Sequence, residues 1–100
     1  MEVKVALQTD LPTGKMIGIE NSGQKIVVAN VSGAYYAVGN ICTHRGCKLS
    51  EGTLNEERVQ CPCHGSIFDI RTGAVIKGPA TNPEESFKVR VDGEAILVTT

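Results

Sequence analysis

Apolar and polar residues alternate near both ends of the chain, with the period of two that is typical of half-buried β-strands. Val3, Val5 and Leu7 share one face near the amino terminus, and residues 87–91 repeat the pattern near the carboxyl terminus. Turn signals recur roughly every eight to twelve residues between such stretches, and no stretch requires a helix. The pattern predicts an all-β domain of short antiparallel strands.

Short runs of Gly, Pro, Asn, Asp and Ser mark the turns, because these residues favour the backbone angles of tight turns. The runs are Pro12-Thr13-Gly14, Asn21-Ser22-Gly23, Asn30-Val31-Ser32-Gly33 and Asp92-Gly93. The third predicts a hairpin in which residues 25–29 and 34–38 pair across a four-residue loop, and the fourth predicts a two-residue turn.

The middle of the chain carries a different signal, since all four cysteines and both histidines lie between Cys42 and His64. Glycines punctuate this stretch, which indicates loops joined by short strands such as residues 58–60 and 67–69. Packing alone is a poor reason for six such residues within 23 positions. Metal binding is the better interpretation.

Composition narrows the class of protein. The chain has 100 residues, the size of one small domain, and 41% of them are hydrophobic. Its net charge of −1 offers nothing to attract a phosphate backbone or an anionic membrane surface. No signal peptide is evident, and no apolar run reaches the ~20 residues of a membrane span. We therefore expect a single soluble, cytoplasmic domain over residues 1–100, without a nucleic-acid partner or a membrane segment.

The clustered residues form two blocks, each with two cysteines and one histidine: Cys42-Thr43-His44-Arg45-Gly46-Cys47 and Cys61-Pro62-Cys63-His64-Gly65-Ser66. Thiolate and imidazole bind both zinc and iron–sulfur centres. A structural zinc-binding module is one interpretation, although zinc fingers usually pair Cys with Cys and His with His. If the two leading cysteines instead bind one metal and the two histidines a second, the loops clamp a binuclear centre.

At this point the residues resemble a known family. Cys42-x-His44 and Cys61-x-x-His64, within the strings CTHRGC and CPCHGS, resemble the signature of Rieske iron–sulfur proteins. The resemblance implies one Rieske-type 2Fe-2S cluster per chain. It also implies that Cys42 and Cys61 bind the inner iron and that His44 and His64 bind the outer iron.

The resemblance also implies a fold and a division of the chain. Rieske proteins have an antiparallel β-sandwich or barrel base with a small inserted cluster-binding subdomain. Here the base would comprise residues 1–40 and 78–100, and the subdomain would span about 41–77.

Cys47 and Cys63 are not needed as ligands in that scheme. They resemble the pair that forms a disulfide between the two cluster loops in Rieske proteins of cytochrome bc complexes. Soluble ferredoxins of ring-hydroxylating oxygenases usually lack this pair, and disulfides are unusual in the cytoplasm. The resemblance implies a Cys47–Cys63 bond, and two free thiols are the alternative.

Three residues are implied to surround the cluster. Ser66 stands where high-potential relatives place a hydroxyl near a bridging sulfide. At Phe68 those relatives carry a tyrosine whose phenol bonds a ligand sulfur, so Phe68 favours a lower reduction potential. Pro79 belongs to the loop that covers the cluster. The acidic run Asn82-Pro83-Glu84-Glu85 follows, where the family more often has a leucine, and it predicts a solvated turn.

The sequence shows no nucleotide-binding loop or nucleophile motif. The resemblance implies a soluble one-electron carrier rather than an enzyme, a monomer that receives electrons from a reductase and passes them to an oxygenase or another acceptor. One alternative is an electron-transfer subunit, or an excised soluble domain, of a bc-type or oxygenase/reductase complex. The zinc-binding module is the alternative from another class.

Overall fold

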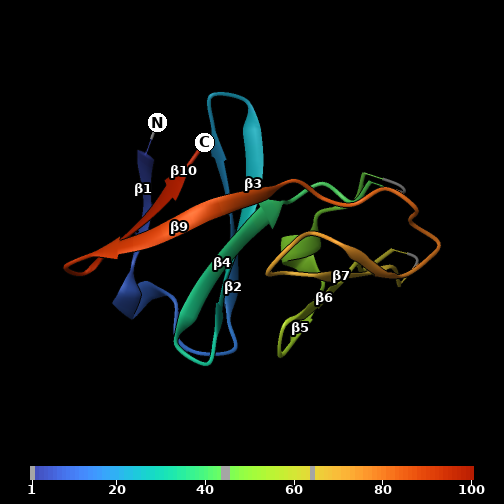
Figure 1. Cartoon of the computed structure of the whole chain (residues 1–100), viewed down its shortest axis with the longest axis horizontal. Helices are drawn as coiled ribbons and strands as arrows, with labels where there is room; N and C mark the ends of the chain where they lie inside the picture. The colour runs from blue at the N-terminus through green and yellow to red at the C-terminus, as the bar shows by residue number, and fades with distance from the viewer. Residues whose placement is uncertain (1, 44–45, 64) are drawn as a thin grey trace.

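The computed structural model describes residues 2–43, 46–63 and 65–100, and these form two antiparallel sheets (Figure 1). The larger sheet has the strand order β1-β10-β9-β4-β3-β2. Its strands are β1 (Glu2–Leu7), β2 (Met16–Asn21), β3 (Gln24–Val31), β4 (Ala34–Gly39), β9 (Ser86–Asp92) and β10 (Ala95–Thr99). The smaller sheet contains β5 (Thr53–Asn55), β6 (Arg58–Gln60), β7 (Ile67–Asp69) and β8 (Val75–Lys77), paired in that order.

The predicted all-β class is confirmed. Within the described ranges the helical segments are two short 3-10 turns, η1 (Gln8–Asp10) and η2 (Leu49–Glu51). The short strands expected at 58–60 and 67–69 are present with those bounds as β6 and β7. No helix in this part of the chain is long and apolar enough to cross a membrane.

Two turn predictions need correction. The predicted four-residue loop between β3 and β4 is a two-residue turn, because Val31 still pairs with Ala34. Ser32 and Gly33 form the turn with φ of 53° and 91°, the positive values that match the twist of a tight hairpin. Between β9 and β10, Asp92 pairs with Ala95, so the turn lies one residue later than predicted.

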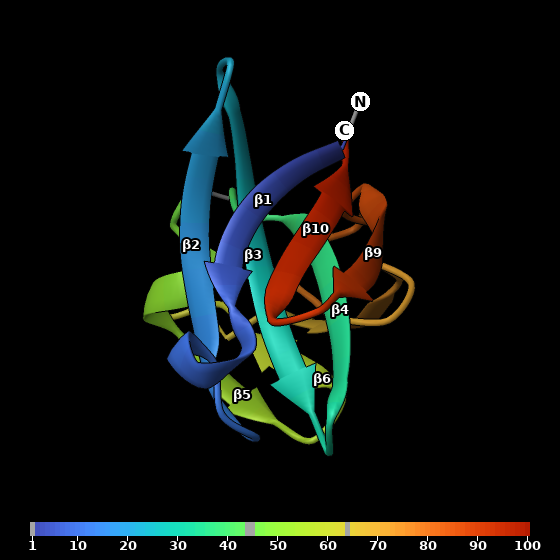
Figure 2. The same cartoon turned by 90° about the vertical axis from the view of Figure 1, so that its left-hand side faces the viewer.

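The strand β3 is buried on both faces, and it separates two hydrophobic cores. Val27 and Ala29 belong to the core shared with the smaller sheet and the loops around it. Ile26 and Val28 belong to a second core. Apart from Leu11, the residues of this core come from strands of the larger sheet, including β10. Figure 1 shows the smaller sheet beside β4 at one end of the molecule, and Figure 2 shows β1 and β10 on the opposite side of β3. The first core therefore lies where the two cysteine loops meet the larger sheet.

Candidate metal centre

The two cysteine-containing blocks fold into loops of the same construction. In the first loop (residues 42–47), Cys42 N donates to Cys47 O at 2.7 Å and Gly46 N donates to Cys42 O at 2.9 Å. In the second (residues 61–66), Cys61 N donates to Ser66 O at 2.8 Å and Gly65 N donates to Cys61 O at 3.3 Å. The two glycines share a φ of 78°, which only glycine adopts readily. Each loop thus begins with a cysteine held in the same backbone setting.

Those two leading cysteines are buried. Cys42 is 2% exposed and Cys61 is 3% exposed, and both belong to the core shared with the smaller sheet. His44 and His64, the other two predicted ligands, lie outside the described residues. The structure therefore brings the two predicted thiolate ligands into one core and leaves the imidazoles untested.

Cys47 and Cys63 are joined by a disulfide, with their Cα atoms 6.4 Å apart, so the implied bond between the loops is present. The sulfurs of Cys47, Cys61 and Cys63 all lie within 4.8 Å of one another. A disulfide sulfur is not a thiolate and binds metal poorly. Of these three cysteines, only Cys61 can therefore offer a thiolate.

Ser66 is fully buried, and its hydroxyl oxygen accepts a hydrogen bond from Ala80 N at 3.0 Å. Because the oxygen is the acceptor there, the hydroxyl hydrogen can still be donated to another group. Pro79 is exposed and follows a cis Gly78–Pro79 peptide bond, so the buried contact of this loop comes from Ala80. Phe68 is fully buried in the same core as Cys42 and Cys61.

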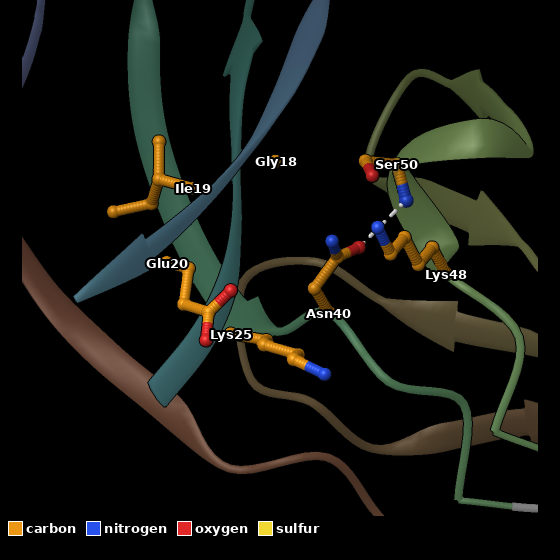
Figure 3. A pocket seen from close by; sticks show the side chains of 7 residues that line it. All are labelled: Gly18, Ile19, Glu20, Lys25, Asn40, Lys48 and Ser50. Carbon is orange, nitrogen blue, oxygen red and sulfur yellow. Dashed lines mark hydrogen bonds between the residues drawn. The ribbon is translucent and has the colours of Figure 1, made fainter. Parts of the chain in front are cut away.

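Asn40, which no sequence pattern singled out, joins the segment before the first loop to the segment after it. It is 4% exposed, its Oδ1 accepts from Ser50 N at 2.8 Å, and its carbonyl accepts from Leu49 N at 2.7 Å. Figure 3 shows Asn40 reaching toward Ser50 in a polar pocket of about 190 Å³. A Cβ at Gly18 would lie 2.6 Å from Ser50 Oγ and 2.8 Å from Asn40 Nδ2, so the strand approaches this anchor closely only with glycine.

The prediction of a solvated turn at residues 82–85 is wrong for Glu84, which is only 7% exposed. Its Oε2 accepts a hydrogen bond from Thr43 N at 3.0 Å, while Thr43 Oγ1 donates to Asn82 O at 2.7 Å. Burial raises the pKa of Glu84 to about 7, and the Thr43 bond opposes that rise. The acidic run therefore contacts the first cysteine loop.

This arrangement fits a sulfur-ligated metal cluster. Two buried cysteines begin loops that a disulfide ties together, and the second loop ends at a buried hydroxyl with a hydrogen left to donate, that of Ser66. Cysteine thiolates are the usual ligands of iron–sulfur clusters, and hydrogen bonds to their sulfurs tune the potential. The fold and the site fit an iron–sulfur protein.

Comparison with known proteins names the family. The model of the Rieske [2Fe-2S] domain matches residues 1–98, and the chain belongs to this family. It therefore carries a Rieske 2Fe-2S cluster, and its match over most of their length to relatives named ferredoxin components makes it an electron carrier rather than an enzyme. The fold predicted from the resemblance is confirmed.

Three relatives illustrate the match. The ferredoxin component of biphenyl 2,3-dioxygenase from Rhodococcus jostii (strain RHA1) is 36% identical over 95% of this chain and 89% of its own length. The cytochrome b6-f complex iron-sulfur subunit of Chlorobaculum thiosulfatiphilum is 34% identical over 98% of this chain and 53% of its own length. A solved complex of reduced oxygenase and oxidized ferredoxin in carbazole 1,9a-dioxygenase contains a chain with a TM-score of 0.93 and 33% identity, over 97% of this chain and 91% of that one.

The disulfide yields a stability prediction. Replacing Cys47 and Cys63 together by serine is expected to lower the free energy of unfolding by about 3 kcal/mol, because the bond constrains a loop with a sequence separation of 16. Urea denaturation followed by circular dichroism measures the change, with reduced wild-type protein as the control. Equal midpoints for the oxidised wild type and the double variant would contradict a structural role for the bond.

Proposed function

We propose that Cys42 and Cys61 bind one iron of the cluster and that His44 and His64 bind the other. The observation that carries this proposal is the burial of the two cysteines in one core, each at the start of a loop with the same hydrogen bonds. When bound, the cluster accepts and releases one electron at a time. The core residues around the cysteines exclude water from them, and the Ser66 hydroxyl is suited to donate to a cluster sulfur.

Metal analysis of the purified protein tests this ligand set. We expect a red-brown protein with two irons and two acid-labile sulfides per chain, in line with a 2Fe-2S cluster. The reduced protein is expected to show the low average g of a cluster with histidine ligands, because imidazole donates less charge than thiolate and the histidine-bound iron is the one reduced. One zinc and no sulfide would instead support the structural zinc-binding module. A cluster with the g values of all-thiolate ligation would contradict the two histidines.

We propose that the chain is one domain, with a base of residues 1–40 and 78–100 and a cluster-binding subdomain of about 41–77. The division is supported by the two sheets, since β1–β4, β9 and β10 form the larger one and β5–β8 the smaller. The shared core argues that the two parts do not fold separately.

We further propose that the protein is a cytoplasmic monomer that receives electrons from a reductase and passes them to an oxygenase. Relatives named as dioxygenase ferredoxin components, and the solved oxygenase–ferredoxin complex, support a redox partner of this kind. Size-exclusion chromatography tests the monomer. Reduction by a ferredoxin reductase, followed by turnover of a ring-hydroxylating oxygenase, tests the pathway.

The Cys47–Cys63 disulfide favours a second candidate, an electron-transfer domain of a bc-type complex. The alignment with the cytochrome b6-f iron-sulfur subunit includes 98% of this chain but only 53% of that subunit, which is therefore much longer. Electron transfer to a c-type cytochrome, with none to an oxygenase, would support this candidate over the ferredoxin.

The Phe68→Tyr variant is expected to have a higher reduction potential, because a phenol near a ligand sulfur stabilises the reduced cluster by a hydrogen bond. Phe68 shares the core of Cys42 and Cys61, which places the new hydroxyl within that core. A redox titration measures the potential. Phe87→Tyr is the matched control, since Phe87 packs against the other core and should leave the potential unchanged. A Phe68→Tyr protein with an intact cluster and the wild-type potential would show that position 68 does not face a ligand sulfur.

A further inference from the structure

Glu84 is fixed at the junction of three segments. Its backbone N donates to Gly73 O at 2.8 Å, in the turn that follows β7. Its Oε1 lies against the end of β4, where a Cβ on Gly39 would come within 2.7 Å of it. Its Oε2 faces the first cysteine loop. The carboxyl group therefore has a defined position, which an exposed side chain in a turn would lack.

Its partner in that loop is Thr43, the residue between Cys42 and His44. The Thr43 N–H donates to Glu84 Oε2 at 3.0 Å, and the Thr43 hydroxyl donates to Asn82 O at 2.7 Å. The segment 82–84 thus holds Thr43 by its backbone and by its side chain. Because Thr43 lies between Cys42 and His44 in the sequence, these two hydrogen bonds hold the backbone between two proposed ligands.

Stability does not account for a carboxyl group here. Glu84 is 7% exposed. Among the described residues, its carboxyl group accepts one hydrogen bond, from the backbone N–H of Thr43. Ionisation of a buried group is costly unless a counter-charge lies close. Lys25 and Glu85 line the same pocket of about 340 Å³, but no ion pair joins Glu84 to Lys25 in the described part of the chain. A glutamine would accept the same hydrogen bond from Thr43 N without this cost.

We propose that Glu84 is a positioning residue of the cluster, which fixes the first loop through the Thr43 N–H and lowers the reduction potential through its buried negative charge. The inference rests on the proposed ligand set. Reduction adds one negative charge to the cluster, and a carboxylate held near it in a poorly solvated setting opposes that addition. A glutamine at position 84 keeps the acceptor oxygen and removes the charge, whereas a leucine removes both.

The experiment compares Glu84→Gln, Glu84→Leu and the matched control Glu85→Gln, which removes an exposed charge one residue away. Redox titrations are made at pH 8.5, where Glu84 is ionised, and at pH 5.5, where it is protonated, given its pKa of about 7. Glu84→Gln is expected to raise the equilibrium constant for reduction about tenfold at pH 8.5, which is ~59 mV for one electron, and to leave it unchanged at pH 5.5. Glu85→Gln is expected to have little effect at either pH, because water screens an exposed charge.

Glu84→Leu is expected to raise the potential at pH 8.5 as well and, unlike Glu84→Gln, to lose iron faster, because Thr43 N is left without its acceptor. Wild-type potentials for Glu84→Gln at both pH values would overturn the role of the charge, and equal rates of iron loss for both Glu84 variants would overturn the role of the bond. A wild-type protein without a histidine-ligated 2Fe-2S cluster would overturn the ligand set instead, and that failure is visible before any variant is made.

Discussion

Replacing Cys61 by alanine is expected to abolish cluster binding, with iron falling from two atoms per chain to nearly none. The chain has four cysteines, and Cys47 and Cys63 are held in the disulfide. Although their sulfurs lie within 4.8 Å of the Cys61 sulfur, a disulfide cannot replace the missing thiolate. Cys42→Ala is expected to have the same effect, because Cys42 is the other buried cysteine at the start of a loop.

The double variant Cys47→Ser/Cys63→Ser is the matched control, since it removes two neighbouring sulfurs and should keep both iron and colour. Iron and sulfide analysis of all three proteins measures the contrast. Circular dichroism shows whether the larger sheet, which has its own core, persists in the alanine variants. Iron retained by Cys61→Ala, or lost to the same degree from the double variant, would contradict the assignment of Cys42 and Cys61 as ligands.

The stability of the protein is expected to fall between about pH 4.5 and pH 7 because of Glu84. The pKa of its carboxyl group is 4.5 when unfolded and about 7 in the folded protein, where burial favours the neutral form. Below pH 4.5 the group is protonated in both states and its contribution is complete. As the pH rises, the folded state binds more protons than the unfolded state, so the free energy of unfolding falls by up to about 3 kcal/mol.

The measurement is a difference between variants, which cancels the contribution of the other ionisable groups. Glu84→Gln should match the wild type near pH 4.5 and become the more stable protein by pH 8. The midpoint urea concentration at each pH gives the comparison. Glu85→Gln, with an exposed carboxyl group removed, should follow the wild-type curve. Parallel curves for the wild type and Glu84→Gln would show that burial does not hold the carboxyl group neutral.

Local sequence was sufficient for the all-β class and for the position of several strands, whereas the ligand set of the metal centre stays a prediction. The glycines that punctuate the middle of the chain indicated the short strands β6 and β7, because such punctuation is read directly along the sequence. The clustering of cysteine and histidine indicated a metal site, the resemblance implied Cys42 and Cys61 as ligands, and the resemblance also implied the Cys47–Cys63 pair, which the structure contains. The length of the β3–β4 turn depended on whether Val31 stays paired, which its neighbours in sequence do not decide.

The anchors of the first loop could not be predicted in the same way. Asn40 follows a glycine and resembles a loop residue, and Glu84 lies in an acidic run after a proline. Their hydrogen-bond partners lie 10 and 41 residues away in the sequence, namely Ser50 for Asn40 and Thr43 for Glu84. A buried polar side chain is defined by its partners, and a sequence pattern shows only its polarity.

The two-sided burial of β3 leaves its register undetermined by hydrophobicity. In a strand with one apolar face, a slip of one residue exposes that face to water, and the lost burial makes the slipped pairing unstable. In β3 the same slip would only exchange Ile26 and Val28 with Val27 and Ala29, since both sets lie in cores. The two-residue turns at both ends of β3 fix its pairing, and Asn30 adds a polar constraint: its Nδ2 donates to Leu11 O, and its Oδ1 accepts from Gly33 N, both at 2.8 Å. Because Asn30 is 4% exposed, a slipped strand would leave its amide without partners and out of reach of water, so one polar side chain reinforces the alignment that the two turns set.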